Sequence, residues 1–116
     1  MAYEGIREWV RGLPEVGARV RIDETIRYLQ TVKIMQFPDT RVLKGECDGL
    51  VELRIPFNKV QYRMLGFYGP QRGQFTIVLG TTEESRQLQP STRDACKNAL
   101  KRKKQVFSRE KQIYEY

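Results

Sequence analysis

Apolar and polar residues alternate most clearly along residues 50–68, LVELRIPFNKVQYRMLGFY. Residues 50–55 show the period of two that is typical of a half-buried strand. Residues 60–68 are rich in valine, tyrosine, phenylalanine and leucine, and the PFNK segment at 56–59 has turn chemistry. The pattern therefore predicts a β-hairpin.

The predicted hairpin has one apolar and one polar face. A turn at residues 56–59 pairs Leu53 with Tyr62 and gathers five aliphatic side chains and Tyr62 on the face expected to meet the core. Glu52 then lies directly across from Arg63 on the other face. This face is either a solvated surface with one ion pair worth roughly 0.2–1 kcal/mol, or an anion site in which Glu52 fixes the rotamer of Arg63. Its polar side chains are Glu52, Arg54, Gln61 and Arg63.

Apolar residues recur at helical spacing on both sides of Pro14, which suits the first turn of a new helix. Helices over 4–13 and 15–33, joined this tightly, form an αα-hairpin. Asp23 and Arg27 are spaced to form an ion pair on its exposed side. The apolar stripe is expected to be core: Ile6, Trp9, Val10, Leu13, Val16, Val20, Ile22, Ile26 and Leu29.

The rest of the chain predicts two further strands and one helix. Residues 41–44 form a short strand, 75–79 a buried strand, and 80–90 a polar loop. Ser91 and Asp94 resemble a capping box that opens a last helix, which ends near Phe107. We expect this helix to bury Ala95, Cys96, Ala99, Leu100 and Phe107.

Together these elements predict an α+β fold, in which two N-terminal helices pack on a four-stranded antiparallel sheet with a C-terminal helix. A chain of 116 residues is long enough for one core. We expect a single domain over 1–107 and a tail at 108–116 without an assigned element.

The composition limits the kinds of catalytic and metal site that the chain can form. The chain has no histidine, which argues against a zinc site or a Ser-His triad, so we expect no metal and no cofactor. Cys47 and Cys96 lack CxxC or secreted-scaffold spacing and predict free thiols in a reducing compartment. The sequence has no long apolar run and no signal peptide, so we expect a cytoplasmic protein without a membrane segment.

The positive charge is concentrated near the end of the chain. Residues 91–116 hold 8 basic and 3 acidic residues, whereas residues 1–90 hold 13 and 11. The KRKK run at 101–104 covers the exposed side of the last helix. Such a segment suggests an anionic partner such as nucleic acid, or it is a solubilising helix face.

The order of these motifs resembles the RelE/HigB toxin superfamily, and most closely its phage-derived, HigB-like branch. The resemblance covers roughly residues 4–107. The family's usual first strand has no expected counterpart, because only residues 1–3 precede the first helix. The matching segments are Leu43 to Gly45, Leu50 to Arg54, Tyr62 to Leu65, Thr76 to Leu79, and Pro90 followed by a helix with Ala95.

The resemblance implies a metal-independent endoribonuclease that cuts mRNA in the ribosomal A site and is neutralised by a helix-turn-helix antitoxin. RNA would lie on the concave face of the sheet, where Arg54 and Arg63 would hold the scissile phosphate and stabilise its charge. The proton-transfer candidates are Tyr62, Tyr68, Glu52 and Glu84. The residues expected to bind the RNA backbone are Lys44, Lys97, Lys101, Arg102 and Lys104.

One segment departs from the family pattern. After its last strand the branch usually has FxKK, whereas this chain has Thr82-Glu83-Glu84-Ser85. Arg86 would partly replace the missing cations. Carboxylates beside a phosphodiester weaken its binding, since like charges repel most where water is excluded. Either Glu84 or Glu83 is a general base in a variant site, or the activity is reduced or lost.

Three functions therefore stay open. The first is a toxin-like mRNA endoribonuclease of a type II toxin–antitoxin system. The second is a catalytically weakened or inactive RNA- or protein-binding module of phage or mobile-element origin. The third is a plain structural or interaction protein. The sequence leaves the oligomeric state open.

Overall fold

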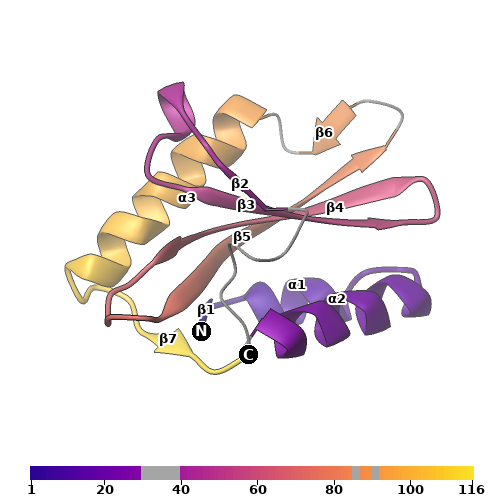
Figure 1. Ribbon diagram of the computed structural model, residues 1–116, viewed down its shortest axis with the longest axis horizontal. Coiled ribbons are helices and arrows are strands. Elements are labelled where there is room, and N and C mark those ends of the chain that lie inside the picture. The colour runs from indigo at the N-terminus through magenta and orange to yellow at the C-terminus, as the bar shows by residue number, and fades with distance from the viewer. Residues whose placement is uncertain (30–39, 85–86, 90–91) are drawn as a thin grey trace.

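The computed structural model describes residues 1–29, 40–84, 87–89 and 92–116. Within them the chain has an α+β fold, with three α-helices and one 3₁₀ turn around a seven-stranded sheet (Figure 1). The strands are β1 (Ala2–Tyr3), β2 (Thr40–Val42), β3 (Val51–Phe57), β4 (Val60–Tyr68), β5 (Phe75–Glu84), β6 (Gln87–Gln89) and β7 (Ile113–Tyr114). The helices are α1 (Ile6–Arg11), α2 (Val16–Leu29) and α3 (Thr92–Phe107), and the 3₁₀ turn is η2 (Gly45–Cys47).

The sheet is mixed, with the order β2-β3-β4-β5-β1-β7 and β6 paired to β5. β1 runs parallel to β5, and the other pairs are antiparallel. The sheet therefore has more strands than the four predicted, and it is mixed instead of antiparallel. A strand also precedes the first helix, where we expected none. β1 and β7 have two residues each, too few to show a hydrophobic period.

The polar segment 80–90 was wrongly predicted to be a loop. β5 continues to Glu84, and Gln87–Gln89 pairs back on its end. Backbone hydrogen bonds to neighbouring strands hold a strand even where its side chains are polar, and hydrophobic periodicity cannot reveal such a strand.

The β3–β4 turn has two residues, Asn58 and Lys59, with φ of 52° and 68°. Positive φ at both positions is typical of tight hairpins, and asparagine tolerates it well. The turn pairs Arg54 with Arg63, which shifts the register by two residues from the prediction. A shift of two leaves every side chain on its predicted face. Glu52 is consequently diagonal to Arg63 and not directly opposite it.

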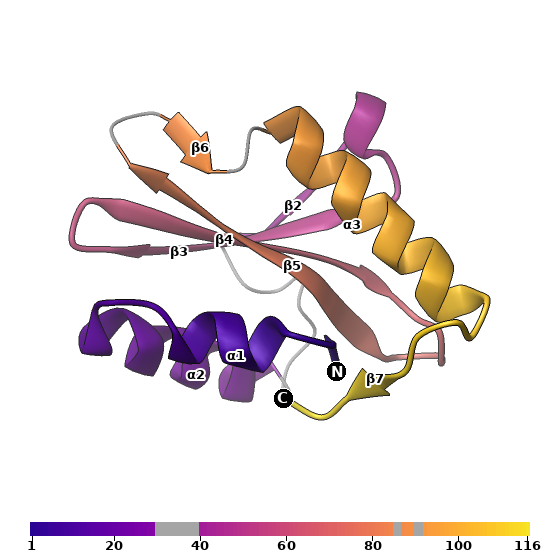
Figure 2. The same cartoon turned by 180° about the vertical axis from the view of Figure 1, so that it is seen from behind.

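Helices cover both faces of the sheet: α1 and α2 lie on one side and α3 on the other (Figures 1 and 2). On the first side the ring of Trp9 covers Gly80, where an added Cβ would lie 2.5 Å from the ring. Trp9 therefore packs against the sheet as predicted. Val16 and Val20 are 63% and 49% exposed, so the predicted stripe was wrong at these two positions. The buried side chains of α2 are Ala18, Ile22, Thr25 and Ile26.

The predicted end of the second helix at residue 33 lies outside the described residues. The predicted ion pair between Asp23 and Arg27 does not form within the described part of the chain. Asp23 accepts a hydrogen bond from the Tyr116 hydroxyl instead.

α3 buries Ala95, Cys96 and Ala99 as predicted. Phe107 was predicted to be buried but is 50% exposed, and its ring lies 5.3 Å from that of Phe67. Val106, one residue earlier, is buried in its place. The helix phase therefore differs from the prediction at its last turn.

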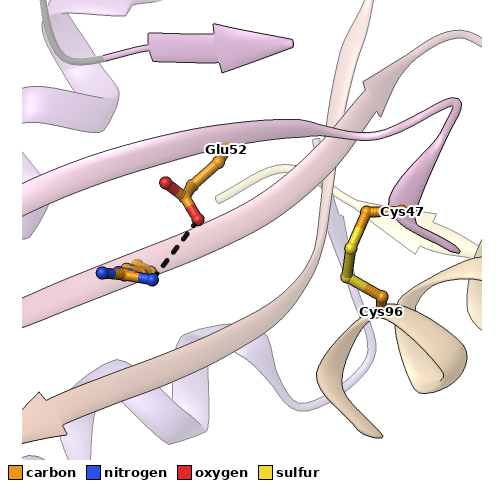
Figure 3. The surroundings of a disulfide bond; sticks show 4 residues. Cys47, Glu52 and Cys96 are labelled. Carbon is orange, nitrogen blue, oxygen red and sulfur yellow. Dashed lines mark ion pairs between the residues drawn. A yellow bond between two sulfur atoms is a disulfide. The ribbon is translucent and has the colours of Figure 1, made fainter. Parts of the chain in front are cut away.

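A disulfide joins Cys47 of η2 to Cys96 of α3 (Figure 3). The prediction of free thiols was wrong. The two cysteines are 49 residues apart, and only the fold brings their Cα atoms to 5.1 Å. The bond attaches the segment before β3 to the N-terminal half of α3.

The tail joins the sheet and then reaches the helical layer. Ile113 and Tyr114 pair with β1, and Arg7 Nη2 donates to the main-chain oxygen of Tyr116 over 2.7 Å. The end of the chain thereby lies beside α1 and α2, as the C label shows (Figure 1).

Candidate functional site

Three adjacent strands form a cross-strand row of polar residues. The register aligns Arg54 of β3 with Arg63 of β4 and Thr81 of β5. Arg63 shares a face of β4 with Phe67, because side chains alternate along a strand. Lys103 of α3 lies 5.6 Å from the Phe67 ring, so the polar row is on the α3 face of the sheet.

Glu52 lies between the two arginines. Arg54 Nε donates to Glu52 Oε1 over 2.5 Å, and Arg63 Nη1 lies 3.8 Å from Glu52 Oε2. Figure 3 shows Glu52 on β3 with one of its ion pairs. The residue is only 6% exposed. Its carboxylate therefore compensates two guanidinium groups that would otherwise face each other across the strands.

A second carboxylate engages Arg63 from the other side. Arg63 Nη2 donates to Glu83 Oε2. Glu83 pairs with Gln61, two residues before Arg63 on β4, which places the two charges diagonally on one face. The cluster of Glu52, Arg54, Arg63 and Glu83, here called the sheet cluster, is formally neutral.

One donor of the sheet cluster lacks a partner. Arg63 Nε is buried and has no hydrogen-bond partner in the described residues. A buried N–H without a partner costs about 1–3 kcal/mol, so an oxygen atom placed there would bind favourably.

The tyrosines do not join the sheet cluster. Tyr62 is 3% exposed and pairs with Ile55, on the face covered by α1 and α2, as the hairpin pattern predicted. Tyr68 packs edge-on against Phe75 with the ring centroids 5.3 Å apart, and its position on β4 also places it on that other face.

The sequence-derived roles of Glu84 and Arg86 fall at the limit of the described chain. Glu84 is the last residue of β5, but its side chain and all of Arg86 lie outside the described residues. Of the two glutamates in the acidic TEES segment, the structure therefore describes the side chain of Glu83, which contacts Arg63. The sequence predicted Glu83 either as a general base or as a carboxylate that weakens phosphate binding, but not its ion pair with Arg63, which depends on the β4–β5 register.

The basic side chains of α3 that the structure describes divide into two groups. Arg102 Nη1 donates to the Val78 carbonyl over 2.7 Å and lies over the Tyr3 ring, while Lys103 Nζ donates to the Gly49 carbonyl over 3.0 Å. These two side chains hold α3 on the sheet. By contrast, Lys97, Lys101 and Lys104 are exposed at spacings of four and three, which aligns them as one stripe on the helix.

Lys44 is exposed immediately before η2. η2 is bonded to α3 through the disulfide, so Lys44 lies on the part of the chain held beside the helix. The lysine stripe (Lys97, Lys101 and Lys104) and Lys44 are therefore exposed cations outside the neutral sheet cluster.

No group of three or more cysteine, aspartate or glutamate side chains is arranged to hold a metal ion in the described ranges. None of the helices described there is long and apolar enough to cross a membrane.

Comparisons with known proteins add no relative. No protein-family model matches the chain. Neither the curated proteins nor the solved structures include a significant match.

Proposed function

We propose that the protein binds RNA along the exposed lysine stripe of α3, as a RelE/HigB-like module whose ribonuclease activity is weak or absent. The single observation that carries this proposal is the contrast between the neutral sheet cluster and the exposed lysine stripe, which forms no ion pair within the described chain. Both arginines that the resemblance assigns to the scissile phosphate already contact carboxylates.

Electrostatics explain why such a site binds phosphate poorly. An RNA phosphate at Arg63 must displace the Glu83 carboxylate or lie beside it, and both arrangements cost free energy. The lysine stripe has no such competitor, because none of its members forms an ion pair within the described chain. RNA affinity would then come mainly from Lys97, Lys101 and Lys104, and it would fall with salt concentration.

Binding of a short single-stranded RNA, measured at several salt concentrations, tests this proposal. The Lys97→Gln/Lys101→Gln variant should lower the slope of log K against log salt by about 1.4, from roughly 0.7 per lost phosphate contact. Arg21→Gln/Arg72→Gln removes the same charge from exposed positions outside α3 and is the matched control. Equal loss of affinity in both variants would contradict the assigned surface.

A metal-independent endoribonuclease is the second candidate, and the unpartnered Arg63 Nε favours it. If a phosphate displaced Glu83, Arg54 and Arg63 would stabilise the extra charge on phosphorus. The freed Glu83 would accept the 2′-OH proton as that oxygen attacks phosphorus and the bond to the 5′-oxygen breaks. A solvent water protonates the leaving 5′-oxygen, and the hydroxide so formed takes the proton from Glu83, which leaves a 2′,3′-cyclic phosphate and a free 5′-OH.

The Glu83→Gln variant separates the two candidates. For a binding module, the wild type makes no cuts and Glu83→Gln binds RNA more tightly, because a competing charge is removed. For a nuclease, the wild type yields new 5′ ends, and both Glu83→Gln and Arg54→Ala/Arg63→Ala abolish them. Glu24→Gln, at an exposed site on α2, is the control.

Mapping of 5′ ends should use free mRNA and ribosome-bound mRNA in parallel. The resemblance proposes the ribosome and a helix-turn-helix antitoxin as partners of the same surface. Cuts only on ribosome-bound mRNA would favour the toxin-like candidate.

A further inference from the structure

A second charged site lies on the opposite side of the molecule from α3. Among the described residues, a pocket of about 200 Å³ is lined by Arg7 and Arg11 of α1, Asp23 and Arg27 of α2, and Tyr116 of the tail. Figures 1 and 2 show the tail returning past β7 to the helical layer. We call this group of five residues the arginine pocket.

The helical hairpin explains how the arginine pocket forms. Arg7 and Arg11 are four residues apart, as are Asp23 and Arg27, so each pair lies on one side of its own helix. Tyr116 is then added from a distant part of the chain by two hydrogen bonds. Its hydroxyl donates to Asp23 Oδ1, and its main-chain oxygen accepts from Arg7 Nη2 over 2.7 Å.

The charge balance of the arginine pocket differs from that of the sheet cluster. Among the side chains that line the pocket, three guanidinium groups face one carboxylate, and that carboxylate accepts a hydrogen bond from Tyr116. Within the described ranges, Arg7, Arg11 and Arg27 form no ion pair with an acidic side chain. The sheet cluster, in contrast, has one carboxylate for each arginine.

Tyr116 stays a neutral donor in this setting. Burial and the hydrogen bond to Asp23 raise the pKa of the phenol well above its ordinary value, although the Arg7 and Arg11 charges oppose this shift. The phenol proton thus stays between the tyrosine oxygen and Asp23 at neutral pH. The Asp23 carboxylate is in this way directed to Tyr116 and not to the arginines.

We propose that the arginine pocket binds a phosphate group, with Arg11 and Arg27 as its principal ligands and Arg7 at the junction with the tail. Guanidinium groups present paired N–H donors that match phosphate oxygens. The side chains that line the pocket include three arginines and one carboxylate, whereas the sheet cluster has equal numbers of the two. The site is separate from the proposed RNA surface and does not depend on it.

Titration of isotope-labelled full-length protein with inorganic phosphate, followed by NMR of arginine Nε–H and backbone amide signals, tests the proposal. Sodium chloride at equal ionic strength is the control for screening. Phosphate should shift the signals of residues 7–11, 23–27 and 116, and Arg11→Gln/Arg27→Gln should weaken binding about tenfold or more. Equal shifts with chloride, or equal weakening by Arg21→Gln/Arg72→Gln, would overturn it.

Two RNA probes identify the source of the phosphate. A short RNA with a 5′-phosphate that binds the arginine pocket more tightly than its 5′-hydroxyl counterpart assigns the site to a terminal phosphate of RNA. Binding of inorganic phosphate without this preference assigns it to free phosphate. Either assignment requires that Arg11→Gln/Arg27→Gln weakens the binding. If neither inorganic phosphate nor either RNA binds the arginine pocket, the proposal is refuted.

Two variants separate this site from the rest of the molecule. Tyr116→Phe leaves the Asp23 carboxylate without its donor, so it should compete for the arginines and weaken phosphate binding; unchanged binding would contradict the role given to Tyr116. Lys97→Gln/Lys101→Gln should leave phosphate binding intact even though it weakens RNA binding at α3. Failure of the RNA proposal and failure of this one are therefore distinguishable.

Discussion

Glu52 compensates the charges of both arginines in the sheet cluster. It is 6% exposed and contacts both Arg54 and Arg63, which are direct cross-strand neighbours. A buried charge that loses its partner is far more costly than an exposed one. Glu52 thus stabilises the fold even where the sheet cluster has no catalytic role.

Glu52→Gln tests this requirement. The amide keeps the shape but removes the charge between two arginines, so we expect a loss of about 1–3 kcal/mol in unfolding free energy. Urea denaturation of wild type and variant measures it, with exposed Glu24→Gln expected within about 0.5 kcal/mol of wild type. Unchanged stability would mean that solvent already screens the two arginines.

Tyr116 predicts a pH dependence of stability. Its folded pKa is raised from an ordinary value of 10.0, first by burial and then by its hydrogen bond to Asp23. Below pH 10 the phenol is neutral in both states and its stabilisation is complete. Above pH 10 only the unfolded chain releases the proton, so the free energy of unfolding falls as pH rises.

Thermal denaturation between pH 8 and about pH 11, for wild type and Tyr116→Phe, measures this effect. The wild type should be more stable at pH 8, by about 1 kcal/mol for the hydrogen bond, and the difference should narrow above pH 10. A constant difference across the range would show that the phenol titrates normally.

Helices and strands were predictable from the sequence where their packing imposes a period on the apolar residues, and they were unpredictable where it does not. The alternation along β3 and β4 assigned each side chain to its correct face, including Tyr62 in the core. The register was missed because a shift of two residues preserves that alternation and only the backbone of Asn58 and Lys59 distinguishes the two pairings.

Within the candidate site, sequence reasoning brought Glu52, Arg54 and Arg63 onto one face but not Glu83. The contribution of Glu83 depends on how far β5 extends, and its polar end gives no hydrophobic signal. The tail was missed for a related reason, since a two-residue strand is defined by its neighbour β1 and not by its own residues.

The disulfide is the covalent connection between η2 and α3. The bond joins two cysteines that are 49 residues apart. Because it restricts the unfolded chain, such a bond contributes about 2–4 kcal/mol to the free energy of unfolding. Cys47→Ser/Cys96→Ser should lose that amount in urea denaturation without reductant. Dithiothreitol should destabilise the wild type but leave the variant unchanged, and an equal response of both would show that the bond contributes nothing.

At the scale of the whole molecule, two sides of the fold carry different charge arrangements. The α3 side combines a neutral cluster with exposed lysines, and the α1/α2 side has an arginine pocket completed by the tail. Because the tail contacts β1, α1 and α2, its removal should affect both the sheet edge and the pocket.

Deletion of residues 112–116 tests how far the tail belongs to the fold. It removes the β7 pairing and both Tyr116 contacts, so we expect the melting temperature to fall by about 4 °C or more. Tyr116→Phe, which keeps β7, should lower it less. Equal melting of the deletion variant and wild type would show that the tail adds no stability.

The Cys47–Cys96 bond has a practical consequence for every functional assay proposed here. Thiol pools in a bacterial cytosol keep most cysteines reduced, whereas purification in air favours the bond. Protein assayed inside cells and protein assayed after purification can thus be two covalent species of one sequence. Alkylation of free thiols, followed by mass spectrometry, distinguishes the oxidised from the reduced protein before each assay. If two assays disagree, the oxidation state of Cys47 and Cys96 in each should be compared first.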